Sequence, residues 1–240
     1  MTQRTANFDP GFLRGLFDEM EATYGTVNMI SSLGFTWRWR RQCLDKVTLS
    51  QDMLVCDLMT GMGELIPSIA RRCFGQASVK AIDFSPNMCR RARQWIGKLG
   101  DLRVEILECD ALENPIETGT VDAVVSTFGV KTLSVEQQRS LAREVHRLLR
   151  PGGVFSFLEV SVPAAWILRV PYLFYVDFVI PVIGRILLGN PVNYRYLGVF
   201  TKAFGNCREF AAILSEAGLS ASYYSQFGGC ATGVCGRKPV

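Results

Sequence analysis

Short apolar runs alternate along the chain with longer segments whose apolar positions recur at helical spacing. The short runs predict strands over residues 53–58, 78–83, 103–109, 121–127 and 153–160. The helical spacing predicts helices over residues 62–73, 86–98, 135–149 and 207–217. Strand–helix alternation at this spacing indicates parallel strands joined by right-handed crossovers. We therefore expect an α/β fold built on a doubly wound, mostly parallel sheet.

Turn residues punctuate this pattern. Ser85-Pro86 suits a helix start, with serine as the cap and proline in the first turn. The segment 150–153, Arg-Pro-Gly-Gly, ends one helix and turns into the next strand. Two short runs, 220–227 and 230–236, are split by Gly228-Gly229, which predicts a closing hairpin.

Two segments depart from this alternation. Residues 1–50 read as helices, one opening at Asp9-Pro10 and another over 35–44. Residues 164–188 are strongly apolar and aromatic, but charges and prolines interrupt them too often for a membrane-spanning helix. Two interpretations remain: a lid over an apolar pocket, which we favour, and a surface patch for homodimer or membrane contact.

The chain of 240 residues suits one large domain. We expect a single domain over 1–240, with an N-terminal helical cap (1–50), a cofactor-binding core (51–163), an apolar lid insertion (164–206) and a closing helix and hairpin (207–240). The polar N-terminus and eight scattered cysteines indicate a reducing cytoplasm, with peripheral contact to a membrane as the variant. A single histidine argues against a metal site, and the net charge of +4 comes with no nucleic-acid-binding motif.

The most informative segment is 55–65, Val-Cys-Asp-Leu-Met-Thr-Gly-Met-Gly-Glu-Leu. An apolar run ends in Asp57, a turn with Gly61 and Gly63 follows, and a helical pattern comes next. Asp83 ends the following apolar run, twenty residues after Gly63, where a ribose-binding carboxylate is expected. This combination predicts a nucleoside-binding corner, although a glycine turn that only joins a strand to a helix is the plainer alternative.

Charge selects the nucleotide that this corner fits. Ile66 stands where a dinucleotide-binding turn has its third glycine, and Asp57 and Glu64 flank the turn. Two carboxylates repel a pyrophosphate and suit a cationic ligand. S-adenosyl-L-methionine carries a sulfonium, an ammonium and a ribose diol without phosphate, so we favour it over NAD.

Residues at neighbouring strand ends complete the expected cofactor site. We expect Asp83 to accept hydrogen bonds from the ribose hydroxyls and Asp110 from the adenine amino group. Phe84 or Met88 would pack against the adenine ring. The further candidates for cofactor binding are Thr60, Ala111 and Thr127.

Several segments in order resemble one family. They are Phe17-Asp18 with Tyr24 and Asn28, Gly34–Arg41, Asp57–Glu64, Asp83, Phe128-Gly129, Leu149–Gly153, Leu158-Glu159 with Ser161, and Tyr194–Leu197. Nearly end to end, the chain resembles a class I S-adenosylmethionine-dependent methyltransferase of the ubiquinone/menaquinone C-methyltransferase family. The resemblance implies a seven-stranded sheet with an antiparallel last pair, and often dimers or membrane-associated complexes. It also makes Tyr24 a candidate for cofactor binding.

The sequence departs from that family at two places. Lys131 and Thr132 stand where an Arg and an Asn thought to help activate the quinone ring are usual, and Thr60 and Met62 replace a glycine and a threonine of the turn. We expect Lys131 to stabilise a developing phenolate and Glu159 to act as the base. Tyr194 and Arg195 would orient the ring oxygens from the lid, and His146 is a surface residue.

These residues predict methyl transfer to an apolar, prenylated or polycyclic aromatic acceptor that resembles a quinone precursor. An N- or O-methyltransferase of a lipid headgroup or secondary metabolite is a second hypothesis. The third is an S-adenosylmethionine-binding enzyme with other chemistry, such as cyclisation or amino transfer.

Overall fold

Seven strands form one sheet at the centre of the computed structural model, which describes residues 7–32, 34–96, 102–187 and 190–240. The strands are β1 (Leu54–Leu58), β2 (Ser78–Asp83), β3 (Arg103–Glu108), β4 (Val121–Thr127), β5 (Leu149–Val160), β6 (Ser220–Gln226) and β7 (Ala231–Arg237). Their order is β3-β2-β1-β4-β5-β7-β6. The first five are parallel, and β7 is antiparallel to both β5 and β6. The doubly wound sheet and its closing hairpin are therefore confirmed.

Helices cover both faces of this sheet because each presents one apolar side to it. On one face α5 (Val135–Leu148) and α9 (Arg208–Glu216) pack over Phe155 and Phe157 of β5. On the other face α3 (Ile66–Arg72) buries Ile66 and Ile69 against β1 and β2. Beside it lie α2 (Phe35–Leu44) and α4 (Pro86–Ile96).

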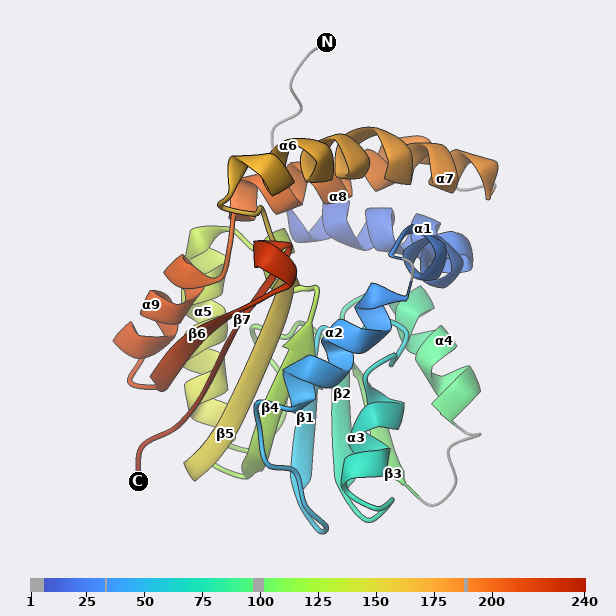
Figure 1. Ribbon diagram of the computed structural model, residues 1–240. Coiled ribbons are helices and arrows are strands. Elements are labelled where there is room, and N and C mark those ends of the chain that lie inside the picture. The colour runs from blue at the N-terminus through green and yellow to red at the C-terminus, as the bar shows by residue number, and fades with distance from the viewer. Residues whose placement is uncertain (1–6, 33, 97–101, 188–189) are drawn as a thin grey trace.

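A third layer of helices lies across the carboxyl ends of the parallel strands (Figure 1). It consists of α1 (Pro10–Ser31), α6 (Trp166–Phe174), the π-helical η2 (Tyr175–Val179), α7 (Ile180–Ile186) and α8 (Pro191–Phe204). Leu13 and Met20 of α1 form a core of their own with Tyr194 and Phe200 of α8. Ligands of open α/β sheets bind at this edge, so the layer is placed to cover such a ligand.

The structure corrects two predicted boundaries. The helix predicted over 62–73 begins only at Ile66, since Gly61 and Gly63 adopt positive φ angles of 57° and 76° that a helix does not allow. The predicted turn at 150–153 lies within β5 as a bulge: Leu149 pairs with Val121 and Val154 with Ala123. Residues 97 and 98 of the predicted helix 86–98 lie outside the described part.

Candidate functional site

The first cavity lies at the carboxyl ends of β1 and β4, where the strand order reverses. Such a switch point is the usual ligand site of an open α/β sheet. The cavity measures about 100 Å³. Its wall includes Thr60, Gly61, Phe84, Met88, Ala111 and Thr127, all of which the sequence predicted as cofactor-binding residues.

Asp83 is the anchor of this cavity. Its Oδ2 accepts a hydrogen bond from the Gly61 amide at 2.7 Å and its Oδ1 one from the Ser85 amide at 3.0 Å. Burial raises the pKa of this carboxyl group to about 6, against its two amide hydrogen bonds, which lower it. Each carboxylate oxygen keeps lone pairs for a further donor, so Asp83 retains the capacity to accept hydrogen bonds from two hydroxyl groups.

Asp57 lies beneath the glycine turn and not in the cavity wall. Its side chain is buried, and its Oδ2 accepts a hydrogen bond from the Thr60 hydroxyl at 2.6 Å. Burial raises its pKa to about 7. The predicted direct contact of Asp57 with the methionine portion does not fit the structure. Thr60 lines the cavity, and Asp57 lies behind it as the acceptor of its hydroxyl. Gly63 also lies outside the wall, packed against Ile66 and Ala92.

Glu64 lines the cavity, but it is paired. Arg40 of α2 forms an ion pair with the Glu64 carboxylate, and the Arg40 guanidinium also lies 5.2 Å from the Phe128 ring centroid. This pairing weakens the argument that two free acids flank the turn. The described wall still holds three carboxylates, Glu64, Asp83 and Asp110, and one cation, Arg40. Its balance remains acidic and favours a cationic ligand over a pyrophosphate.

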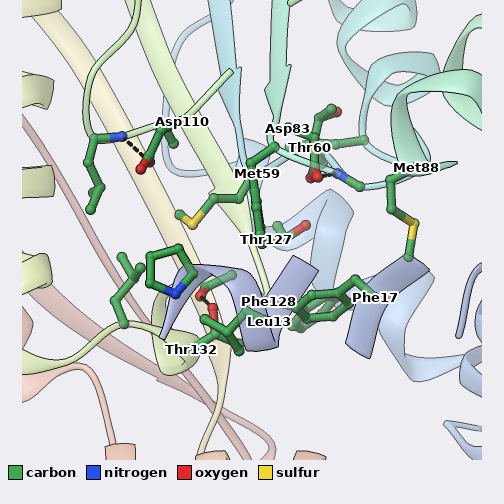
Figure 2. A pocket seen from close by; sticks show the side chains of 18 of the residues that line it. Leu13, Phe17, Met59, Thr60, Asp83, Met88, Asp110, Thr127, Phe128 and Thr132 are labelled. Atoms are coloured by element: carbon green, nitrogen blue, oxygen red, sulfur yellow. Dashed lines mark hydrogen bonds between the residues drawn. The ribbon is translucent and has the colours of Figure 1, made fainter. Parts of the chain in front are cut away.

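Figure 2 shows Asp83 and Asp110 on opposite sides of Met59 at the strand ends. The Asp110 Oδ1 accepts a hydrogen bond from the Leu112 amide at 2.9 Å, which fixes the carboxylate at the end of β3. Leu13 and Phe17 of α1 lie across the cavity from these acids. The N-terminal helix α1 therefore forms this side of the cavity wall.

Two bulky residues of the wall have left-handed backbones. Met59 follows β1 with a φ of 55°, and Phe128 follows β4 with a φ of 68°. This conformation costs a non-glycine residue about 1–2 kcal/mol. A Cβ on Gly129 would lie 2.8 Å from the Met59 side chain, so glycine is required there. Strained residues at a strand edge are typical of ligand sites.

A second cavity, of about 310 Å³, adjoins the first. Phe128 lines both cavities, so they meet at this residue. The second wall is mainly apolar and aromatic: Phe35, Trp39, Tyr172, Tyr175, Val176, Ile180, Leu197 and Phe227 contribute to it. Lys131 is the only charged side chain among the described residues of this wall. Thr132, its neighbour, lines the first cavity.

Lys131 is held by a buried carboxylate. Its Nζ lies 3.0 Å from the Glu159 Oε1 and also donates to the Phe128 carbonyl. Glu159 is fully buried and additionally accepts from the backbone amides of Lys131 and Val160. A general base must reach the proton that it removes. Glu159 lines neither cavity, so it does not fit the predicted role of base and instead positions Lys131.

Two further predicted residues, Tyr194 and Arg195, lie away from both cavities. Tyr194 is fully buried in the α1–α8 core against Gly184, and Arg195 is exposed on α8. Neither residue fits the predicted role of orienting a ring, because the Tyr194 side chain points into the core and the Arg195 side chain into solvent. Tyr24 belongs to α1, and its side chain lies outside the described part. His146 is half-buried on α5 and lines neither cavity, as expected.

Sequence reasoning left out several residues of the first wall. Leu13, Phe17, Met59 and Gln137 were not proposed as cofactor contacts, although the Phe17-Asp18 pair had been noted. All eight cysteines are free thiols, and the described residues contain no cluster that could hold a metal ion. The first cavity fits S-adenosylmethionine in three respects: its wall is acidic, Asp83 offers two carboxylate oxygens as acceptors, and Phe84 and Met88 provide an apolar surface.

A model of the ubiE/COQ5 methyltransferase family matches residues 6–238. The chain belongs to the ubiE/COQ5 methyltransferase family. It is an S-adenosylmethionine-dependent methyltransferase, as predicted. Among relatives of this family, the demethylmenaquinone methyltransferase of Thermus thermophilus is 33% identical over 224 residues, which cover 93% of this chain and 100% of the relative. The ubiquinone/menaquinone biosynthesis C-methyltransferase UbiE of Desulfotalea psychrophila is 31% identical, covering 88% and 84%.

Solved structures agree with the fold of this ubiE/COQ5 family member. A SAM-dependent methyltransferase from Aquifex aeolicus superposes with a TM-score of 0.57 at 21% identity, covering 82% of this chain and 88% of that one. A geranyl diphosphate C-methyltransferase from Streptomyces coelicolor gives a TM-score of 0.59 at 14% identity, covering 85% and 79%. At these identities the likeness concerns the fold alone.

Proposed function

We propose that this enzyme methylates a ring carbon of an apolar aromatic acceptor, a precursor of a quinone, held in the second cavity. One observation carries the proposal: Phe128 lines both an acidic cavity and an aromatic one, so the two cavities adjoin at this residue. The names of the relatives, which refer to demethylmenaquinone and to ubiquinone/menaquinone biosynthesis, support the same acceptor class. The second cavity, at about 310 Å³, is large enough for a small aromatic head.

Bound S-adenosylmethionine supplies an activated methyl group, so the protein has mainly to position the acceptor and exclude water. Asp83 and Asp110 would hold the ribose and the adenine. Leu13 and Phe17 of α1 exclude water from one side of the first cavity. Because Phe128 lines both cavities, an acceptor in the second cavity would lie beside the cofactor site.

Lys131 would activate the ring. An ammonium has three N–H donors, and the Phe128 carbonyl and the Glu159 carboxylate take two of them. The third is left to donate to an acceptor oxygen. An ionised acceptor hydroxyl carries negative charge that it shares with the ring carbon, and a fixed cation in an apolar cavity stabilises that charge. The ring carbon would take the methyl group as the bond from methyl to sulfonium breaks, and the ring proton would then leave to water. No carboxylate or imidazole belongs to the described wall, so the acceptor would react as its phenolate.

The second hypothesis, methylation of a lipid headgroup, has less support. A headgroup carries phosphate or amine groups that need several polar partners, and the described wall offers one lysine and the hydroxyls of Ser32, Thr36 and Thr201 besides two tyrosines. The third hypothesis, chemistry other than methyl transfer, is not retained for a member of this family. Cytoplasmic location at a membrane that dissolves the acceptor remains part of the proposal, whereas no observation favours a homodimer.

An assay with two variants of one helix tests the proposal. The purified protein is incubated with methyl-labelled cofactor and a short-chain demethylmenaquinol. We expect label in the extracted quinol, and loss of at least nine-tenths of the turnover in Val176→Phe, which fills the second cavity. Val182→Phe, on the exposed side of the same helical segment, serves as the control. Label found only in added headgroup amines, or full turnover in Val176→Phe, would contradict the proposal.

A further inference from the structure

The helical segment 166–186, formed by α6, η2 and α7, exposes a continuous apolar face. Among the described residues this is the one helix long and apolar enough to cross a membrane, and only 17% of it is buried. It lies along the outside of the molecule, over α8 and α1, as the outermost layer (Figure 1). Six large apolar side chains, each more than half exposed, recur at every fourth position: Trp166, Val170, Phe174, Phe178, Val182 and Ile186.

The π-helical turn limits how far this row rotates around the helix. A row at every fourth position drifts around a regular α-helix. The wider turn of η2, Tyr175–Val179, lies at the middle of the row and offsets part of that drift. The result is an apolar stripe about 30 Å long at 1.5 Å per residue. Stripes of this size on a protein surface mark contacts with another apolar body.

The charges of the segment favour a lipid surface over a second copy of the chain as the partner of this stripe. Asp177, its only acidic residue, points inward and pairs with Lys202 of α8 at 2.9 Å. Arg169 and Arg185 are exposed near the two ends of the stripe, and neither forms an ion pair with a described residue. In a two-fold dimer through this stripe, either helix direction would bring these arginines against arginines of the other copy. An anionic lipid surface instead places phosphates beside both.

The opposite side of the same segment forms part of the second cavity. Tyr172, Val176 and Ile180 line it from within. Phe227 also lines the cavity and is 61% exposed, so it stands at the cavity mouth. A Cβ on the adjacent Gly228 would lie 2.6 Å from Leu168 of α6, which places the mouth beside the apolar stripe.

We propose that segment 166–186 lies in the plane of an anionic membrane surface, with its exposed apolar stripe inserted among the acyl chains, so that the acceptor passes from the lipid past Phe227 into the second cavity. The access route rests on the proposed function, whereas the membrane contact itself does not. Arg169 and Arg185 bind lipid phosphates at the ends of the stripe. The helix is at once a membrane anchor and the outer wall of the acceptor cavity.

Vesicle flotation without cofactor or acceptor tests the contact. We expect the protein to float with vesicles of phosphatidylglycerol and phosphatidylcholine, and Phe174→Glu/Phe178→Glu to bind at least tenfold more weakly. Phe74→Glu is the matched control, since Phe74 is 76% exposed after α3, away from the stripe. Arg169→Gln and Arg185→Gln should each weaken binding to the anionic vesicles roughly fivefold and leave binding to pure phosphatidylcholine unchanged.

Three outcomes would overturn the proposal: no flotation of the wild type, equal flotation of Phe174→Glu/Phe178→Glu, or a dimer in sedimentation that this variant dissociates while no vesicle binds. Turnover separates this inference from the proposed function. Phe174→Glu/Phe178→Glu should lose turnover of a long-chain demethylmenaquinol in vesicles and keep turnover of a short-chain one in solution. Loss of both activities with intact flotation of the wild type would count against the shared access route.

Discussion

The ammonium of Lys131 lies 3.0 Å from the Glu159 Oε1, and both side chains are buried, 5% and 0% exposed. An isolated buried charge is costly, so each residue stabilises the charged form of the other. Glu159 ends β5 in the core, while Lys131 reaches the second cavity from η1 (Val130–Thr132). The pair therefore fixes the Lys131 ammonium, which lines the second cavity, to a strand of the central sheet.

Replacing one partner of this pair should cost more than replacing both. Lys131→Met leaves the Glu159 carboxylate buried without a cation, which should lower the free energy of unfolding by about 3–5 kcal/mol. The double variant Lys131→Met/Glu159→Gln should recover most of the lost free energy of unfolding. Both variants should lose at least tenfold in turnover and keep cofactor affinity within twofold. Urea unfolding, calorimetry and initial rates measure the three quantities, and full turnover in the double variant would refute the role of Lys131.

Asp83 should decide cofactor affinity. Asp83→Ala removes the charged acceptor and frees the amides of Gly61 and Ser85, which it now orders. A hydrogen bond to a charged group contributes about 1.5–3 kcal/mol, so we expect roughly ten- to hundredfold weaker binding of the cofactor by calorimetry. Glu105→Gln, an exposed carboxylate on β3, is the control. Unchanged affinity in Asp83→Ala would remove this residue from the site.

Cofactor affinity should also fall in acid. Burial raises the pKa of Asp83 to about 6, so this carboxyl group is increasingly protonated below pH 6. A protonated carboxyl has less capacity to accept from two amides and two hydroxyls, and it carries no charge to balance a cationic ligand. We expect the dissociation constant to rise about tenfold for each pH unit below 6. A constant that is flat from pH 7 to 5 would contradict this.

Asp57 should destabilise the free protein at alkaline pH. Its pKa is about 7 in the folded protein, against an ordinary value of 3.8. Between about pH 4 and 7 the folded state thus binds more protons than the unfolded chain, and stability falls as the pH rises through that window. Asp57→Asn should stabilise the protein at pH 8 by a few kcal/mol, since one pKa unit corresponds to about 1.4 kcal/mol, and have little effect at pH 4. Urea midpoints at both pH values test this, with Glu105→Gln as the control for loss of an exposed carboxylate.

The strands and the position of Asp83 in the cavity wall could be predicted because their signals are local. An apolar run that ends in an acid and a glycine turn specifies both a strand and its edge, and Asp83 lies where that spacing placed it. The helices of residues 164–206 could not be resolved from sequence, because apolar side chains surround them and prolines interrupt them. The two faces of that segment differ only in what packs against each, which is a tertiary property.

Three of the predicted catalytic residues, Glu159, Tyr194 and Arg195, line neither cavity for a similar reason, whereas Lys131 lines the second. Glu159 and Lys131 were recognised separately, but nothing local indicates that one buries and positions the other. Tyr194 and Arg195 are adjacent, and adjacent residues of a helix point in different directions, so one entered the core and the other the solvent. Arg40 comes from α2 to pair with Glu64, a contact between residues 24 positions apart that changes the charge of the turn.

Opening of α1 should limit cofactor association. The first cavity measures about 100 Å³, whereas small-molecule sites usually measure at least about 300 Å³. Leu13 and Phe17 occupy the side across from Asp83 and account for the small volume. Asp18 holds α1 to the corner by accepting from the Ser85 hydroxyl. In stopped-flow measurements the observed rate of product-cofactor binding should reach a plateau, the opening rate, that Asp18→Ala raises several-fold. Glu19→Gln, whose hydrogen bond goes to Asn190 instead, should leave the plateau unchanged, and a rate that rises linearly with ligand concentration would exclude a closed α1.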